Sequence, residues 1–397
     1  MSNMNINHER ANTFLQKLVK INTVNPPGNE YAIAKVISEH AENNNLKSKI
    51  KPLTNGRANI VIELEGKNPK LPPLVFSGHL DTVPVGEQQN WEKKPTSGEL
   101  IDGKIHGRGS CDMKSGVAGL IEAMIHMKES DNLPEANITF IGTAGEEVDC
   151  IGAKAVIKDK IINNAGAMVI AEPSKNLVYS AHKGALWVEV IIYGKTAHGS
   201  MPSQGVNAID YMRVFLERLN QLRFLNEKIH PLLGKPTLNV STIEGGIQTN
   251  VVPDQCKVTV DIRTIPEIAH SEIVNGIQEI LTGMETEWGL FHSELNILHD
   301  LPPLANKKND TFVDLALHVN QEIRGTELLE KGANYYTDGS VFAPALDLPI
   351  IIYGPGDEKM AHQPNEYVDV DRYIEAIQYY ISIARVYSKT QREVNSK

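Results

Sequence analysis

Histidine and acidic residues follow short apolar runs at several places in the sequence. His79 and Asp81 come directly after the run at residues 74–77, and residues two apart on an extended chain point the same way. An imidazole that binds a metal usually donates its other ring N–H to a carboxylate, and Asp81 is placed to accept it. Most isolated His-x-Asp pairs are ordinary polar contacts of loops, so this pair alone indicates little.

Three glutamates occupy comparable positions. Glu146 and Glu147 end a stretch of apolar and small residues that begins with the run at 138–142, and Glu172 follows residues 168–171. Two adjacent acids usually belong to a solvated loop. These acids, however, come at the expected carboxyl ends of strands, which is where the sites of open α/β sheets lie.

Asp112 and His362 complete the candidate set. Asp112 lies in the glycine-rich segment 107–116, just before an expected helix. It could be a helix N-cap, but Ser115 already supplies a cap candidate and leaves Asp112 free to face a site. A lone loop histidine is usually an ordinary polar residue, yet His362 follows another apolar run, at 349–353, which favours a ligand. Two imidazoles and several carboxylates suit Zn²⁺, Co²⁺ or Mn²⁺.

The apolar runs that precede these residues are expected to be strands of one sheet. They are too short for helices, and their uniform apolarity suits strands buried on both faces. They alternate with helical patterns, which is typical of an α/β fold; in the helix at 115–128 the apolar spacing predicts one buried face. The expected strands are 59–64, 74–77, 138–142, 167–171 and 349–353, and the expected helices are 9–19, 30–41, 115–128, 310–322 and 370–387.

A different pattern occupies the middle of the chain. Its expected elements follow the order β-α-β-β-α-β, the split βαβ arrangement. They are residues 185–193, 207–222, 238–243, 257–262, 271–281 and 292–298. We therefore expect an α/β domain made of residues 1–181 and 295–397, with a second domain of residues 182–294 inserted into it.

The composition argues against several classes of protein. The formal net charge of -10 disfavours a nucleic-acid partner, whose phosphates would require a basic face. No run of about 18 apolar residues predicts a membrane span. Three cysteines without paired spacing, and a polar first segment (MSNMNINHERANTF), favour a reducing, cytoplasmic compartment. The lack of a Gly-x-Ser-x-Gly motif argues against a serine hydrolase.

Taken together, five segments resemble those of the acetylornithine deacetylase, succinyl-diaminopimelate desuccinylase and carboxypeptidase G family of co-catalytic metallopeptidases. The resemblance covers nearly the whole chain, and the motifs occur in the family's order. They are residues 77–84 (SGHLDTVP), 107–114 (GRGSCDMK), 145–147 (GEE), 171–173 (AEP) and 361–363 (AHQ). The resemblance implies a zinc-peptidase-like α/β catalytic domain with an inserted ferredoxin-like lid and dimerisation domain.

The same resemblance implies a role for each candidate residue. It implies two divalent cations per subunit, Zn²⁺ first with Co²⁺ or Mn²⁺ as alternatives, and a cis peptide bond between Asp112 and Met113. It assigns His79 and Glu172 to one cation, Glu147 and His362 to the other, Asp112 to both, Glu146 to the general base and Asp81 to the orientation of His79.

Other residues are implied to contact the substrate. His198, in the segment 196–202 (TAHGSMP), would bind the reacting carbonyl oxygen. The segment 337–340 (TDGS) resembles the desuccinylase version of a substrate loop. The inserted domain would join two copies into a homodimer. The other implied substrate-binding residues are Asn250, Arg263, Thr337 and Ser340.

The expected activity is hydrolysis of the amide bond of a small N-acyl amino acid. Desuccinylation of N-succinyl-diaminopimelate in lysine biosynthesis is the first expectation, and deacetylation of acetylornithine is the second. A dipeptidase or aminoacylase would use the same metals on a peptide bond. A protein that holds metal without turnover is the non-enzyme alternative, and the presence of Glu146 argues against it.

Overall fold

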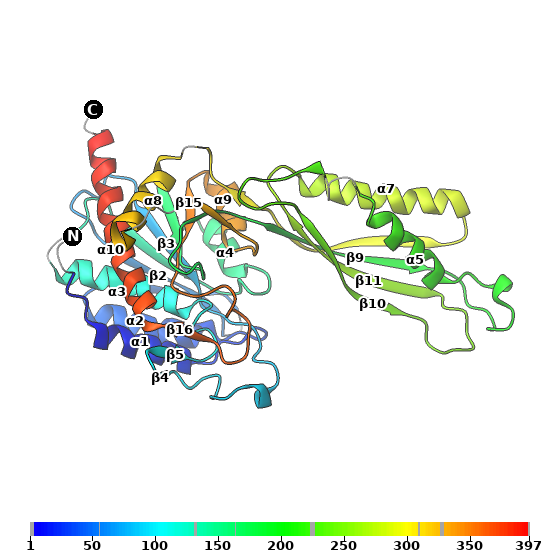
Figure 1. Ribbon diagram of the computed structural model, residues 1–397, viewed down its shortest axis with the longest axis horizontal. Helices are drawn as coiled ribbons and strands as arrows, with labels where there is room; N and C mark the ends of the chain where they lie inside the picture. The colour runs from blue at the N-terminus through cyan, green and yellow to red at the C-terminus, as the bar shows by residue number, and fades with distance from the viewer. Residues whose placement is uncertain are drawn as a thin grey trace. The chain divides into compact units, whose positions relative to one another are not determined.

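The computed structural model describes residues 4–54, 56–130, 133–162, 164–222, 227–308, 310–325 and 329–395. The chain divides into two compact units (Figure 1). The first unit comprises Met1–Ala181, Asn306–Lys331 and Thr337–Lys397, and the second comprises His182–Ala305 and Gly332–Tyr336.

Most strands of a long mixed sheet belong to the first unit. Within the described residues its strand order is β1-β2-β6-β3-β7-β15-β8-β13, and β14 pairs with β8. The strands are β1 (Lys47–Pro52), β2 (Ala58–Leu64), β3 (Leu74–His79), β6 (Ile138–Thr143), β7 (Ala167–Ile170), β8 (Tyr179–His182), β13 (Leu304–Ala305), β14 (Lys331–Ala333) and β15 (Ile350–Ile352).

Four neighbouring strands in the middle of this sheet run parallel. β3 pairs with β6 and β7, and β7 pairs with β15. Every residue of β3, β7 and β15 is buried, as the uniform apolarity of these runs predicts for strands covered on both faces. Because the four strands are parallel, their carboxyl ends lie at one edge of the sheet.

Helices cover both faces of the sheet (Figure 1). α3 and α10 pack on each other and on β3, α1 packs on α3, and α4 packs on β6 and α9. The expectation of one buried face for the helix at 115–128 is wrong, because α3 is buried on all sides as far as Ile125. The helices are α1 (His8–Lys20), α2 (Glu30–Asn43), α3 (Lys114–Glu129), α4 (Ile151–Lys158), α8 (Thr311–Arg324), α9 (Gly339–Leu346) and α10 (Val370–Asn395).

A small antiparallel sheet accompanies the long one in the first unit. It has the order β16-β5-β4, with Tyr367 opposite His106. The strands are β4 (Glu99–Ile101), β5 (Lys104–His106) and β16 (Tyr367–Asp369), and a short 3-10 helix, η1 (Gln88–Asn90), precedes them. These strands have three residues each and show no periodicity that a sequence pattern could reveal.

The second unit contains a four-stranded antiparallel sheet of order β10-β11-β9-β12. With α5 and α7 packed on each other, it has the expected β-α-β-β-α-β order, and the predicted ferredoxin-like fold is confirmed. The sequence placed the end of this domain at residue 294; the compact unit extends to Ala305, because β12 stays paired with β9 as far as Leu301. The elements are β9 (Gly184–Tyr193), η2 (Pro202–Gln204), α5 (Ala208–Leu219), β10 (Thr237–Gly245), β11 (Gln255–Thr264), α7 (His270–Trp288) and β12 (His292–Leu301).

Among the residues that the structure describes, no helix combines the length and apolar character that crossing a membrane requires.

A buried histidine at the end of β8 makes the stability of the fold depend on pH. The Nδ1–H of His182 donates to the carbonyl of Lys183 at 2.9 Å, and its Nε2 has no partner in the described structure. Burial lowers the pKa of His182 to about 4. Below pH 6.5 the imidazole of His182 therefore becomes protonated in the unfolded chain but stays neutral in the folded chain. Because protonation then favours the unfolded state, the contribution of the neutral His182 to the free energy of unfolding is complete above pH 6.5 and is lost as the pH falls towards 4.

We expect the free energy of unfolding to fall less steeply between pH 6.5 and 4 in His182→Gln than in the wild type, by at most about 3 kcal/mol over that range. Denaturant unfolding at a series of pH values measures this slope. His318→Gln is the matched control, because His318 is exposed and should leave the slope unchanged. Parallel curves for wild type and His182→Gln would contradict the assignment.

Candidate metal centre

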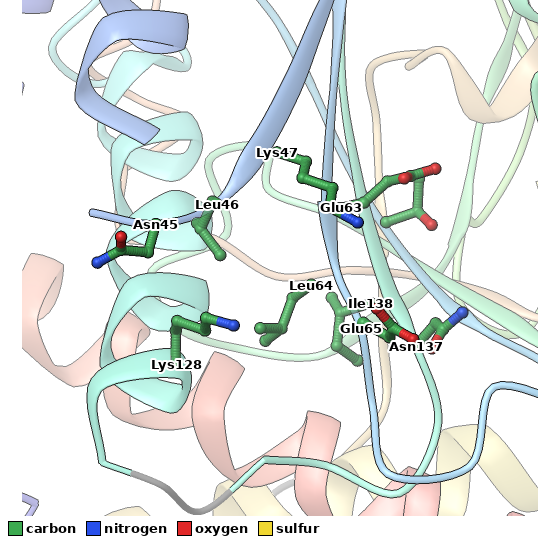
Figure 2. A pocket seen from close by; sticks show the side chains of 10 residues that line it. Asn45, Leu46, Lys47, Glu63, Leu64, Glu65, Lys128, Asn137 and Ile138 are labelled. Carbon is green, nitrogen blue, oxygen red and sulfur yellow. The ribbon is translucent and has the colours of Figure 1, made fainter. Parts of the chain in front are cut away.

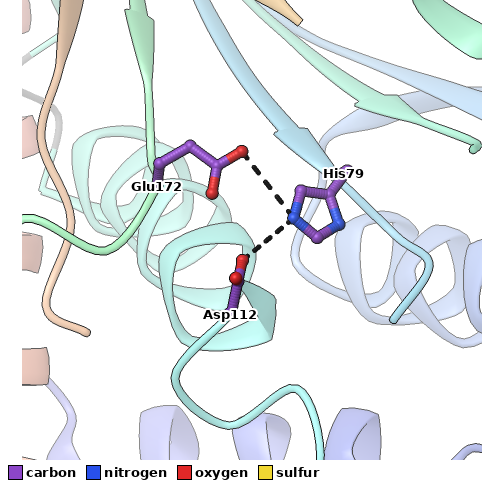
Figure 3. Close-up of side chains that lie close together, drawn as sticks. All are labelled: His79, Asp112 and Glu172. Atoms are coloured by element: carbon purple, nitrogen blue, oxygen red, sulfur yellow. Dashed lines mark hydrogen bonds and ion pairs between the residues drawn. The ribbon is translucent and has the colours of Figure 1, made fainter. Parts of the chain in front are cut away.

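One group of candidate ligands gathers where β3 and β7 end. His79 is the last residue of β3, and Glu172 follows β7 by two residues. Asp112 lies two residues before α3. The Nε2 of His79 is 3.1 Å from Oδ1 of Asp112 and 3.7 Å from Oε1 of Glu172, so one imidazole nitrogen and two carboxylates converge (Figure 3).

A second group shares Asp112 with the first. The Nε2 of His362 is 3.4 Å from Oδ2 of Asp112 and 3.2 Å from Oε2 of Glu147. In each group the ligand atoms all lie within 4.8 Å of one another. The two oxygens of Asp112 thus face different groups, which is the arrangement that a carboxylate bridging two cations requires.

The backbone near both groups adopts unusual conformations. The peptide bond between Asp112 and Met113 is cis, so this expectation is confirmed. His362 has φ 63°, in the left-handed region that a non-glycine residue adopts only where its surroundings hold it. His362 is also half exposed, whereas His79 is buried. The second group is therefore the one open to solvent.

The charges of the two groups fit divalent cations. Burial raises the pKa of Glu172 to about 8, and it raises the pKa of Glu147 as well. Hydrogen bonds to Asp112 and Glu147 raise the pKa of His362 to about 10. The Oε1 of Glu147 is buried with no hydrogen-bond partner among the described residues. Mixed nitrogen and oxygen donors with an unsatisfied carboxylate oxygen are suited to Zn²⁺, Co²⁺ or Mn²⁺.

Glu146 is buried next to the ligands without belonging to either group. Burial raises the pKa of Glu146 well above its ordinary value, and the charge of Glu172 raises it further. Its backbone N–H donates to Oδ1 of Asp81 at 3.1 Å. A carboxyl group with a raised pKa binds a proton more readily than an ordinary carboxylate, which suits a residue that takes up a proton and passes it on during a reaction.

The carboxylate of Asp81 contacts a different partner from the one expected. The Nδ1–H of His79 donates to the backbone carbonyl of Asp81 at 3.0 Å, while the carboxylate Oδ1 lies 3.6 Å away. The carboxylate instead accepts hydrogen bonds from three backbone N–H groups and one side-chain amide, namely those of Gly145, Glu146, Glu147 and Asn25. Asp81 therefore fixes the tautomer of His79 through its carbonyl and holds the turn of Glu146 and Glu147 through its carboxylate.

Two predicted substrate residues lie at the start of α9 in the first unit. Oγ1 of Thr337 accepts a hydrogen bond from the N–H of Gly339, the first residue of α9, at 2.9 Å. The buried Oγ of Ser340 has no partner among the described residues. Between them lies Asp338, which accepts from Oγ1 of Thr143 at 2.6 Å and whose pKa burial raises to about 6. The sequence pattern did not single out Asp338, although it stands within the quoted motif.

The other three predicted residues belong to the second unit. The Nδ1 of His198 is 2.8 Å from Oγ of Ser200, and the N–H of Gly199 donates to the carbonyl of Asn250 at 2.8 Å. The segments of His198 and Asn250 are thus joined within that unit. Arg263 forms an ion pair with Asp261, 3.0 Å away on the same strand, so its guanidinium already has one carboxylate partner.

A hollow elsewhere on the first unit lacks this chemistry. It has a volume of about 190 Å³ and is lined by residues of β1, β2, β6 and the end of α3, among them Lys47, Glu63 and Lys128 (Figure 2). Its described lining includes no histidine or cysteine. No residue predicted for the site lies there.

The fold and the metal centre define a metal-dependent hydrolase that acts on amide bonds. Residues 75–386 match the peptidase family M20/M25/M40, and the chain belongs to this family. The resemblance inferred from the five motifs is therefore confirmed.

Relatives agree with this membership along nearly the whole chain. A protein of Staphylococcus aureus named probable succinyl-diaminopimelate desuccinylase is 30% identical, over 94% of this chain and 97% of its own length. The crystal structure of an aminopeptidase of Bacillus cereus has a TM-score of 0.77 at 24% identity, covering 96% of this chain and 98% of that one. A dinuclear metal-binding peptidase of Bacillus subtilis has a TM-score of 0.74 at 17% identity, covering 96% and 99%. These two structures show the same fold.

Proposed function

We propose that the chain is a two-cation N-succinyl-diaminopimelate desuccinylase of lysine biosynthesis. The observation that carries the chemistry is the position of Asp112, whose two oxygens face two separate ligand groups. The substrate is supported by the Staphylococcus aureus relative of that name, which matches this chain over 94% of its length.

His79 and Glu172 would hold one divalent cation, Glu147 and His362 the other, and Asp112 both. Such ions polarise a carbonyl group and lower the pKa of a nearby water towards about 7. The Nδ1–H of His79 is fixed by the carbonyl of Asp81, which leaves Nε2 free to act as a ligand. Zn²⁺ is the first choice for this donor set.

Glu146 would carry the proton during hydrolysis. Its carboxylate accepts a proton from the attacking water, holds it in the buried site, and delivers it to the leaving amine nitrogen. The products are a carboxylate and a free amino group. His198 would donate a hydrogen bond to the reacting carbonyl oxygen, and the remaining residues proposed to bind the substrate are Asn250, Arg263, Thr337 and Ser340.

A dipeptidase or aminoacylase is the second candidate, favoured by the likeness to the aminopeptidase of Bacillus cereus. Acetylornithine deacetylase is a third, since the same chemistry serves any small acyl group. The deciding experiment is an assay of the purified chain with Zn²⁺ or Co²⁺ on N-succinyl-diaminopimelate, N-acetylornithine and a set of dipeptides. A kcat/KM highest on the succinylated substrate supports the proposal, and a higher value on a dipeptide replaces it with the second candidate.

We also propose that the second unit joins two copies of the chain into a homodimer. β10 is an edge strand of its sheet, and an edge strand offers unpaired backbone groups to another strand. Ile243 in this strand is 58% exposed.

We propose that the protein works in the reducing cytoplasm, because its three cysteines are buried and form no disulfide bond.

For this dimer we expect Ile243→Glu to weaken self-association, because a charge on each copy would repel the other at a paired edge. Sedimentation velocity over a range of protein concentrations measures the shift towards monomer. Ile297→Glu, which changes an exposed residue of β12 at the opposite edge of the sheet, is the matched control. Equal effects of the two variants would show that β10 is not the contact.

A further inference from the structure

A buried ion pair joins two loops that carry ligands. Arg108 is 5% exposed and Glu366 is fully buried, and Nη1 of Arg108 donates to Oε2 of Glu366 at 2.5 Å. Arg108 lies four residues before Asp112, and Glu366 lies four residues after His362. Neither side chain belongs to the two ligand groups.

Glu366 holds the loop of Asp112 at three points. Its Oε1 accepts hydrogen bonds from the backbone N–H groups of Cys111 at 2.8 Å and Asp112 at 3.1 Å. Its own carbonyl accepts from the N–H of Gly107 at 2.9 Å. Since the side chain of Asp112 must present one oxygen to each ligand group, the position of its backbone decides whether both contacts can form.

Arg108 holds the loop of His362. Its Nη2 donates to the carbonyl of His362 at 3.4 Å, and its Nη1 donates to the carbonyl of Gln363 at 3.4 Å. Nη2 also reaches the carbonyl of Pro84 at 3.3 Å, in the segment that follows His79. His362 has a left-handed backbone conformation, which persists only where neighbouring contacts fix it.

The small sheet brings the two partners together. β16 begins at Tyr367 and pairs with β5, which ends at His106, so Glu366 and Gly107 are adjacent across this sheet. The fork of a guanidinium can serve a carboxylate and several carbonyls at once, whereas the ammonium of a lysine is a compact charge on a flexible stem. The geometry therefore requires arginine, and a positive charge alone would not suffice.

We propose that Arg108 and Glu366 are positioning residues that fix Asp112 and His362 relative to each other, and so set the affinity of the chain for its second cation. This inference rests on the proposed function, since it presumes that Asp112 bridges two ions. The pair acts through backbone contacts alone. Loss of either partner should displace the ligands while leaving their chemical identity intact.

The test compares Glu366→Gln and Arg108→Lys with a matched control in the full chain. Glu122→Gln is the control, because Glu122 is 1% exposed and pairs with Arg10 at 2.9 Å in the same unit but contacts no ligand loop. Co²⁺ is titrated into each metal-free protein against a competing chelator while its visible absorption spectrum is recorded. The folded state is checked by circular dichroism, and kcat and KM are measured at saturating Co²⁺.

We expect both Arg108→Lys and Glu366→Gln to lose about 10–100-fold in affinity for one Co²⁺, the range typical of residues that orient metal ligands. The spectrum should change, and kcat should fall more than KM changes. Glu122→Gln should lower the unfolding temperature but keep the affinities and the spectrum. Unchanged Co²⁺ affinities in the two test variants, or an equal loss in the control, would overturn the proposal.

Two further results keep the outcome decisive. If neither test variant folds, hydrogen exchange of the metal-free wild type decides: slow exchange at the amides of Cys111 and Asp112 supports the proposal, and exchange as fast as in an exposed loop overturns it. If the wild type itself binds no divalent ion, the proposed function fails. A wild type that binds two ions, together with variants that bind them equally well, leaves the function standing and removes only the role of the pair.

Discussion

Glu146→Gln should lower kcat by about 10²–10⁴-fold while the protein keeps both metal ions. The reason is that Glu146 is buried beside the ligands but belongs to neither group, so its loss removes a proton carrier and no ligand. An amide of the same shape cannot accept the proton of the attacking water. Steady-state kinetics and elemental analysis of the same preparation measure the two quantities together.

Its neighbour provides the contrast. Glu147 lies 3.2 Å from His362 in the second ligand group, so Glu147→Gln should lose metal as well as activity. If both variants retain both ions, the roles given to the two adjacent glutamates are wrong. If Glu146→Gln loses metal to the same extent as Glu147→Gln, Glu146 is a ligand and the proton carrier must be sought elsewhere.

Asp112→Asn should remove both ions and reduce activity to the level of the metal-free protein. Each oxygen of Asp112 faces one group, at 3.1 Å from His79 and 3.4 Å from His362. An asparagine offers one neutral oxygen and an NH₂ group that repels a cation, so neither group keeps its shared anionic ligand. Elemental analysis after dialysis gives the metal content directly.

Two further variants serve as comparisons for the metal content of Asp112→Asn. Glu172→Gln alters one group only and should lose one ion while the other is retained. Asp314→Asn, at an exposed position in the first turn of α8, should retain both ions and full activity. Retention of one ion in Asp112→Asn would mean that the carboxylate serves a single cation.

The sequence predicted that the candidate ligands lie close together, because parallel strands end at the same edge of their sheet. His79, Glu147 and Glu172 each follow a buried apolar run, and runs that pair in parallel end at the same edge. Once β3, β6 and β7 could be located, their last residues had to be neighbours. The position of His362 after β15 follows from the same reasoning.

The helix cap of α3 and the burial of Glu366 could not be predicted from the pattern of apolar runs. Ser115 was expected to cap the helix, but α3 begins at Lys114 without a side-chain cap, and the buried Oγ of Ser115 has no partner among the described residues. Glu366 stands in a polar loop, where an acid usually means solvent exposure. Only the register of β16 with β5, two strands of three residues, reveals that it is buried against Arg108.

The carboxylate of Asp81 shows why a short motif can mislead on partners. Spacing placed it on the same face as His79, and that much is correct, since Oδ1 lies 3.6 Å from Nδ1. The backbone N–H groups of the turn at residues 145–147 compete for the same oxygens and lie closer. That turn comes from a part of the chain 64 residues away from Asp81, which no local pattern contains.

The first unit is made from segments on both sides of the second, and this has a consequence for synthesis on the ribosome. Four of the five proposed ligands precede residue 182, but His362 and the strand β15 are translated only after the second unit, which ends at Tyr336. When β7 and Glu172 have just been translated, the strand β15 and the second imidazole, that of His362, are still absent from the nascent chain. The proposed two-cation site is complete only when residue 362 has left the exit tunnel, so we expect full cation loading to follow the translation of that residue.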